Sequence, residues 1–299
     1  MQRARILVPA MLLLLAGCTA ATPPQPAQPA LAPPSTAYDG VTFVDDLEFG
    51  AADSVRLDVC LPEGDGSALP AVISVHGGGW SQGDKGQRPW RDACAWLAGQ
   101  GFVVFQPNYR LAPEHPYPAA VDDLTAAIEW IRNDEQTQRF GHDPSRLGAF
   151  GDSAGGNLVA LLGTRGEGDT GAGTRVAAVV ALSAPLDLTR AGTGLGDLDS
   201  GFQRTQLDYL GCDSYDDCPA AEAASPALQV DPTDPPFFLA HSTDEFIPVE
   251  QAESFVGRLE AAAVDATYVP VAGAGHALDL LDDDLRRAIS EWLRVRLRG

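Results

Sequence analysis

One serine stands in a sequence context that could make it a nucleophile. Residues 151–155 read Gly-Asp-Ser-Ala-Gly, the G-x-S-x-G pattern in which a tight turn presents the hydroxyl of the central residue, Ser153. The mainly apolar run 146–150 before it predicts a short strand, and the run 157–162 after it predicts a buried helix. Glycines flank the serine because a Cβ atom would clash in so tight a turn. The alternative interpretation is a chance match in a glycine-rich chain.

A glycine loop supplies a second element of the same chemistry. Residues 76–80 read His-Gly-Gly-Gly-Trp and follow the strand-like run 72–75. In acyl transfer, backbone N–H groups of such a loop stabilise the negative oxygen of the tetrahedral intermediate. The predicted donors are the N–H groups of Gly78, Gly79 and Ala154. A phosphate-binding loop is the alternative, but neither a following Lys-Ser/Thr pair nor G-x-G-x-x-G spacing is present.

A serine hydroxyl also needs a base to remove its proton, and the base needs an acid to orient it. His276 is the predicted base, because it follows Ser153 in the chain and lies in a glycine-rich loop after the strand-like run 266–270. The other histidines either precede the serine or stand where a structural role is expected. They are His76 in the glycine loop, His115, His142, and His241 at the end of an apolar run.

Two neighbouring carboxylates compete for the role of the acid. Asp244 and Glu245 both follow the strand-like run 236–240, where the acid of a Ser-acid-His chain order belongs. Asp244 is the predicted acid. Glu245 remains the rival, with a solvated loop carboxylate as its alternative role. Asp279 is a weaker candidate, because it follows His276 in the chain.

Together these motifs resemble the α/β-hydrolase superfamily, close to its hormone-sensitive-lipase-like and ferulic-acid-esterase-like bacterial esterases. The matching stretches are 76–80 with Gly-Asp-Lys at 83–85, Asn-Tyr-Arg-Leu-Ala-Pro at 108–113, residues 151–156, and the loops of Asp244 and His276. The resemblance implies an α/β-hydrolase fold and a cofactor-free ester hydrolase that works through an acyl-serine, with Ser153, Asp244 and His276 as its triad.

The same resemblance leaves other functions open. Asp-Glu-Phe-Ile-Pro-Val at 244–249 departs from the Asp-x-Leu-x-Asp-Glu-Gly that hormone-sensitive-lipase-like enzymes carry around the acid, and is closer to the ferulic-acid-esterase or prolyl-peptidase branch. An amidase or peptidase could use the same residues. A silent binding protein on this fold is the third interpretation, although a complete triad and oxyanion loop speak against it.

The N-terminus predicts export. Arg3 and Arg5 precede an apolar run too short to cross a membrane, so residues 1–17 are interpreted as a signal peptide. The run ends in Leu-Ala-Gly-Cys, which resembles a bacterial lipobox with Cys18 as the lipidated first mature residue. Ordinary cleavage after residue 20 or 21 is the alternative. Residues 18–37 are proline-rich and uncharged, which predicts an extended tether.

The cysteine count indicates disulfides, and the net charge argues against one class of partner. Beyond Cys18, four cysteines remain, and an even number outside the cytoplasm suggests disulfides. Cys212 and Cys218 form an easy local pair, which leaves Cys60 and Cys94 for each other or as free thiols. No metal-ligand spacing is present. A net charge of −21 disfavours nucleic acid as a partner.

Residues 38–299 are predicted to form one α/β-hydrolase domain. Strand-like and helical runs alternate, which favours a mainly parallel sheet with helices on both faces. Residues 190–225 interrupt this alternation and are interpreted as a cap-like insertion above the strand ends, with a surface excursion as the alternative. The predicted strands are 41–49, 54–61, 71–75, 102–106, 146–150, 176–182, 236–240 and 266–270; the predicted helices start near 91, 119, 157, 252 and 280.

Overall fold

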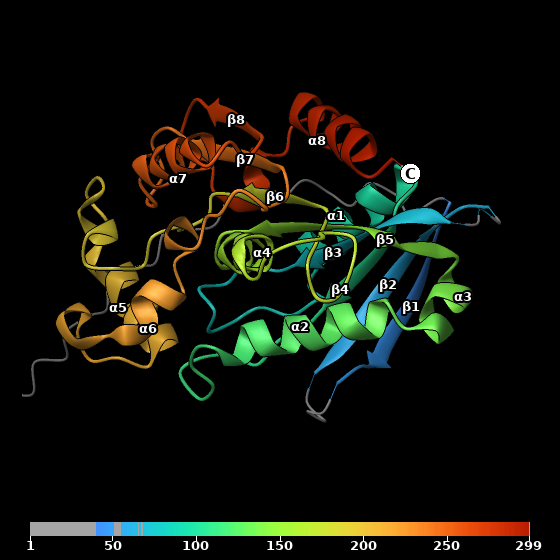
Figure 1. Ribbon diagram of the computed structural model, residues 1–299, viewed down its shortest axis with the longest axis horizontal. Coiled ribbons are helices and arrows are strands. Elements are labelled where there is room, and N and C mark those ends of the chain that lie inside the picture. Colours follow the sequence, from blue (N-terminus) through green and yellow to red (C-terminus); the bar gives the residue numbers. More distant parts are fainter. Residues whose placement is uncertain (1–39, 51–54, 65, 67, 299) are drawn as a thin grey trace, which may run out of the picture. The chain divides into compact units, whose positions relative to one another are not determined.

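The computed structural model describes residues 40–50, 55–64, 66 and 68–298 (Figure 1). The predicted signal peptide, Cys18 and the tether lie outside these residues. In the described part of the chain, no helix has both the length and the apolar character needed to span a membrane.

The described strands form a single eight-stranded sheet in the order β1-β2-β4-β3-β5-β6-β7-β8. The first two strands run antiparallel to their neighbours, and all remaining pairs are parallel, as the alternation of strands and helices predicted. The strands are β1 (Val41–Glu48), β2 (Arg56–Pro62), β3 (Leu69–Val75), β4 (Val103–Pro107), β5 (His142–Asp152), β6 (Ala178–Leu182), β7 (Phe237–Ser242) and β8 (Ala266–Val271).

Helices cover both faces of the sheet, which explains why its central strands are apolar throughout. Successive residues point to opposite faces, so Ala149 packs with α2, α4 and α7, whereas Phe150 packs with α1 and α8. Each face therefore has its own buried core. The helices are α1 (Arg88–Gly99), α2 (Ala119–Ile131), α3 (Asp134–Phe140), α4 (Ala154–Thr164), α5 (Ser200–Leu210), α6 (Pro219–Ala223), α7 (Glu250–Ala261) and α8 (Asp283–Arg296).

The insertion predicted at 190–225 is mainly helical. It contains α5 and α6, which lie together at the left of Figure 1, away from α3 and from β1 and β2. The Trp80 ring of the glycine loop is fully buried and stacks on Tyr209 of α5, with ring centroids 4.4 Å apart and planes 6° apart. The insertion thus packs directly against the loop that was predicted to hold the oxyanion.

Both predicted disulfide pairs are present. Cys60 on β2 is bonded to Cys94 on α1, and Cys212 is bonded to Cys218 within the insertion. Disulfides form and persist in oxidising compartments, so this pairing indicates an exported or extracellular protein.

The two disulfides are expected to have different consequences when removed. Loop-closure entropy assigns about 4 kcal/mol of stability to Cys60–Cys94, which joins residues 34 apart, and about 2 kcal/mol to Cys212–Cys218, which joins residues 6 apart. Cys60→Ser with Cys94→Ser should therefore lower Tm more than the paired change at Cys212 and Cys218. The Cys212–Cys218 variant should instead raise KM, because the insertion contacts the glycine loop. Calorimetry and steady-state kinetics on both variants test this, and the reverse ranking of Tm losses would contradict it.

Candidate active site

Ser153 lies at the carboxyl end of β5, in a strained turn that leads into α4. Its backbone has φ 51° and ψ −120°, a conformation that costs of order 1–3 kcal/mol outside glycine and persists only where the surroundings enforce it. A Cβ atom on Gly151 would lie 2.4 Å from the Gly155 carbonyl oxygen, and one on Gly155 would lie 2.2 Å from the Val75 carbonyl oxygen. Both glycines of the motif are therefore sterically required for this turn.

The glycine loop lies beside the serine. Gly78 has φ +117°, and a Cβ atom there would lie 2.1 Å from the Gln82 carbonyl oxygen, so only glycine fits this close approach. The N–H groups of Ser81 and Gln82 both donate to the Gly78 carbonyl oxygen, which fixes the direction of the peptide. Ala154 is the first residue of α4, so its N–H belongs to the first turn, which has no partner inside the helix. The predicted oxyanion donors are thus carried by two rigid turns.

The Gly-Asp-Lys turn at 83–85 supports this loop from behind. Gly83 touches the ring of His76, where a Cβ atom would lie 2.5 Å from Nδ1. The Lys85 ammonium is buried and lies 2.8 Å from Asp58 Oδ1. His76 is stacked on Tyr109, and its burial lowers its pKa to about 4. The His76 ring is therefore neutral and structural, as the sequence indicated.

The carboxylate partner of His276 is Glu245, and the predicted contact between Asp244 and His276 is absent. Glu245 Oε2 accepts a hydrogen bond from His276 Nδ1. Asp244 is exposed, and its Oδ2 accepts from the hydroxyl of Thr243. After β7 the chain turns so that residue 244 faces solvent and residue 245 faces inward. The expectation that Asp244 orients His276 is therefore corrected to Glu245.

The loop that carries His276 is fastened to the ends of two strands. The Ala277 N–H donates to Ser183 Oγ at 2.9 Å, and the Ser242 hydroxyl donates to the Gly275 carbonyl oxygen. Ser183 follows β6 and Ser242 ends β7. Both bonds therefore hold the histidine loop at the carboxyl ends of the strands, where Ser153 follows β5. The strand predicted at 236–240 and the predicted histidine loop thus lie together at the carboxyl ends of the strands.

Ser153 and His276 line the same pocket, which has a volume of about 400 Å³. Its walls come from the glycine loop, α1, the serine turn, α5 of the insertion and the loops after β7 and β8. Phe246 is 46% exposed, and its ring lies 4.4 Å from that of His276 and 5.4 Å from that of Phe202 on α5. The pocket is lined by Gly78, Gly79, Ser81, Gln82, Trp90, Asp152, Ser153, Phe202, Thr205, Phe246, His276 and Ala277.

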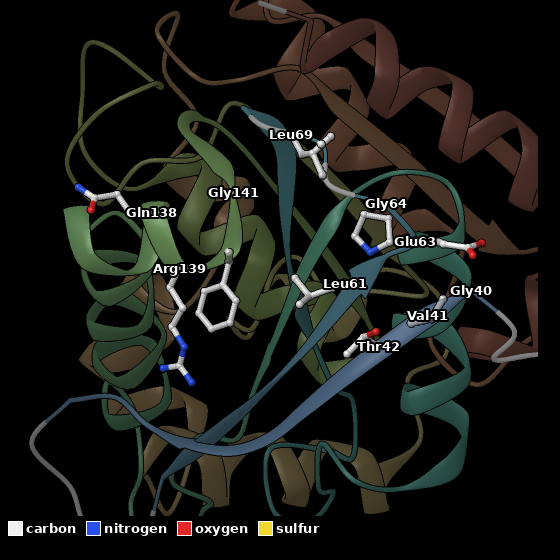
Figure 2. Close-up of a pocket in the computed structure, with 13 residues that line it drawn as sticks. Gly40, Val41, Thr42, Leu61, Glu63, Gly64, Leu69, Gln138, Arg139 and Gly141 are labelled. Atoms are coloured by element: carbon white, nitrogen blue, oxygen red, sulfur yellow. The ribbon is translucent and has the colours of Figure 1, made fainter.

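A larger hollow, of about 520 Å³, lies at the opposite end of β5 beside α3. Figure 2 shows Gln138 and Arg139 on one side of it and Glu63 on the other. Ser153 and His276 are not among its lining residues. Among the described residues, no group of three or more His, Cys, Asp or Glu side chains is arranged to hold a metal ion. The predicted nucleophile and base therefore both lie in the smaller pocket, not in this hollow.

Asp152 carries a buried carboxyl group and directly precedes Ser153 in the chain. Its Oδ1 accepts from Trp90 Nε1 at 2.7 Å and from the Gly77 N–H at 3.2 Å. Burial raises the pKa of Asp152 to about 6, although these hydrogen bonds act in the opposite direction. The folded pKa of this carboxyl is above that of the unfolded chain. Its contribution to the free energy of unfolding is therefore fully present below the unfolded pKa and is lost as pH rises through the folded pKa.

Asp152→Asn is therefore expected to stabilise the protein in a pH-dependent way. The amide oxygen can accept the same two hydrogen bonds without a buried charge. The variant should exceed the wild type in unfolding free energy by on the order of 2–3 kcal/mol at pH 8, because both folded and unfolded carboxyls are then ionised. The difference should shrink towards zero near pH 4. Urea unfolding of both proteins across this range tests the sign, and a pH-independent difference would contradict it.

Comparison with known proteins adds family information to this geometry. A family model described as BD-FAE matches residues 57–259. Esterase LipC of Mycobacterium tuberculosis is 35% identical over 222 residues, which cover 71% of this chain and 54% of LipC. Carboxylesterase NlhH of the same species is 47% identical over 94 residues, which cover 31% of this chain and 28% of NlhH. The alignments thus span about half, or less, of these relatives.

Solved structures have the same fold. A truncated carbohydrate esterase from gut microbiota superposes with a TM-score of 0.73 at 23% identity, covering 86% of this chain and 96% of that one. An acetyl ester-xyloside bifunctional hydrolase from Caldicellulosiruptor lactoaceticus gives a TM-score of 0.68 at 25% identity, covering 82% and 89%. The BD-FAE match extends over more than half of the chain and includes the serine turn and the glycine loop, so this protein belongs to the BD-FAE family, with an α/β-hydrolase fold.

Proposed function

We propose that this protein hydrolyses carboxylic esters through an acyl-serine intermediate. Ser153 Oγ attacks the ester carbonyl carbon while His276 Nε2 takes the hydroxyl proton. The N–H groups of Gly78, Gly79 and Ala154 stabilise the negative oxygen of the tetrahedral intermediate. The alcohol leaves with the proton from His276. Water then attacks the acyl-serine by the same steps, which releases the acid and regenerates Ser153.

One observation carries this proposal: the buried carboxylate of Glu245 accepts a hydrogen bond from His276 in the pocket that Ser153 lines. A carboxylate oxygen accepts, so Nδ1 of His276 carries a proton. In the neutral ring, Nε2 then has a free lone pair, the form that a general base requires. The His276 side chain is 25% exposed, whereas that of Glu245 is 0% exposed, so the acid is shielded from water while the base remains accessible.

The comparisons support ester hydrolysis as the reaction class. The relatives LipC and NlhH are named esterase and carboxylesterase, and the solved neighbours include a carbohydrate esterase. We extend this to small-molecule or polysaccharide-linked esters as substrates. The Phe202 and Phe246 rings give the pocket an apolar wall, which suits the hydrocarbon part of such an ester.

The decisive assay compares an ester with its matching amide. The purified protein should hydrolyse p-nitrophenyl acetate with saturation kinetics and p-nitroacetanilide far more slowly. Faster cleavage of the anilide would favour an amidase. An inert protein that still binds ligands would favour a silent scaffold instead.

We further propose that Cys18 is lipidated and anchors the enzyme to the cell envelope through the tether. Cys18→Ser should then move the protein from the membrane fraction to the soluble fraction or block its processing, because stable anchoring needs acyl chains on this residue. Fractionation and intact mass measurement of the protein expressed in a bacterium test this. A mature N-terminus beyond residue 18 that carries no lipid mass would contradict it.

A further inference from the structure

A second buried histidine lies behind the acid of the site. His241 is 1% exposed and stands near the end of β7. Its Nε2 lies 2.8 Å from the Ile247 carbonyl oxygen and 3.3 Å from Glu245 Oε1. A carbonyl oxygen can only accept, so this Nε2 carries a proton. This N–H group donates to the Ile247 carbonyl oxygen, in the turn that follows Glu245, and the same ring nitrogen also lies close to the Glu245 carboxylate.

The Glu245 carboxylate is held at both of its oxygens. Oε2 accepts from His276, and Oε1 faces His241 and also accepts from the Ser242 N–H at 3.3 Å. A buried carboxylate is unfavourable unless hydrogen-bond donors surround it. Glutamate also has one more rotatable bond than aspartate, so its carboxylate needs more fixation to present a single oxygen to a partner. Burial lowers the pKa of His241, which keeps its ring neutral beside the acid.

We propose that His241 is a positioning residue for the hydrolytic reaction: it fixes the Glu245 carboxylate so that Oε2 holds His276 in the tautomer and orientation needed to deprotonate Ser153. The proposal rests on the proposed function. His241 does not touch substrate, and its effect passes through Glu245. Removing its N–H should therefore reduce turnover and leave substrate binding nearly unchanged.

His241→Leu and His241→Asn both remove the Nε2–H group, and the asparagine variant keeps a polar side chain if leucine impairs folding. Each should lower kcat by about 10- to 100-fold while KM stays within about twofold, as for a partner that orients a catalytic group. His241→Gln should recover most of kcat, because its Nε2 amide can donate from nearly the same position. Equal losses in the Asn and Gln variants would overturn the proposal.

His142 provides a matched control. It is also buried, its Nε2 lies 2.9 Å from the Ile131 carbonyl oxygen, and it starts β5 at the end opposite to Ser153. His142→Leu should lower stability and leave kcat per folded molecule within about twofold of the wild type. An equal fall in kcat in the His142 variant would show that loss of any buried histidine has this effect.

A double-mutant cycle tests whether His241 acts through Glu245. In a Glu245→Ala background, His241→Leu should change kcat by less than about twofold, because the carboxylate that it positions is gone. Full additivity of the two losses would overturn the proposal, since it would place the effect of His241 elsewhere.

A spectroscopic measurement separates this proposal from the proposed function. This measurement needs no activity, so it can use the Ser153→Ala protein. There, the His276 Nδ1 proton shared with Glu245 should give a low-field ¹H NMR signal. His241→Asn should shift or broaden this signal, and His142→Leu should leave it unchanged. An unaltered signal in His241→Asn would overturn the positioning role even if the wild type is an active esterase. A wild type without esterase activity would refute the proposed function, and the NMR comparison would still decide the positioning of Glu245.

Discussion

Ser153→Ala is expected to lower kcat/KM for p-nitrophenyl acetate by at least about a thousandfold while the fold is retained. The variant loses the nucleophile, and the activity that survives should come from substrate binding and the oxyanion donors alone. The alanine side chain fits the space of the serine, so the melting temperature should change little. Initial rates, measured beside blanks without enzyme, give the loss in kcat/KM. A thermal melt gives the change in melting temperature.

Ser81→Ala is the matched control for that variant, because Ser81 lines the same pocket outside the nucleophile turn. Its kcat/KM should stay within a few-fold of the wild type. Comparable losses at Ser81 and Ser153 would remove the distinction on which the nucleophile assignment depends.

Glu245→Gln is the other change for which a very large effect is expected, a loss of about three to four orders of magnitude in kcat. An amide in place of the carboxylate cannot stabilise the imidazolium that forms during attack, and it can stabilise the wrong histidine tautomer. Asp244→Asn should cost no more than a few-fold, because the Asp244 side chain is exposed and bonds to Thr243. Steady-state kinetics on the two neighbouring variants provides the comparison.

The conservative change Glu245→Asp sharpens this comparison. The carboxylate keeps its charge but is shorter by one methylene group, so an intermediate loss in kcat is expected. A larger loss in Asp244→Asn than in Glu245→Gln would return the acid to Asp244 and contradict the geometry of this site.

The sequence predicted those parts of the site that depend on local sterics. The turn around Ser153 requires Gly151 and Gly155, and the glycine loop requires Gly78, because a Cβ atom at each position would collide with a backbone oxygen. Such requirements leave a fixed spacing in the chain. The central strands could also be predicted from the sequence, since burial on both faces leaves a continuous apolar run.

The acid could not be chosen from the sequence, because the choice depends on one turn. Asp244 and Glu245 are adjacent, so a small change of backbone direction after β7 decides which carboxylate points inward. The one informative signal was the spacing of four residues between His241 and Glu245, which the structure shows in contact. The stacking of Trp80 on Tyr209 was equally hidden, because residues so far apart in the chain meet only through the tertiary fold.

Mapping a covalent adduct tests most directly whether Ser153 is the activated nucleophile. Tryptic cleavage after Arg146 and Arg165 releases residues 147–165, a peptide in which Ser153 is the sole serine. After treatment with a fluorophosphonate, tandem mass spectrometry should find one adduct, on Ser153, that forms more slowly in Glu245→Gln and is absent from Ser153→Ala. An adduct on a different peptide, or an active esterase that takes no label at Ser153, would contradict the account.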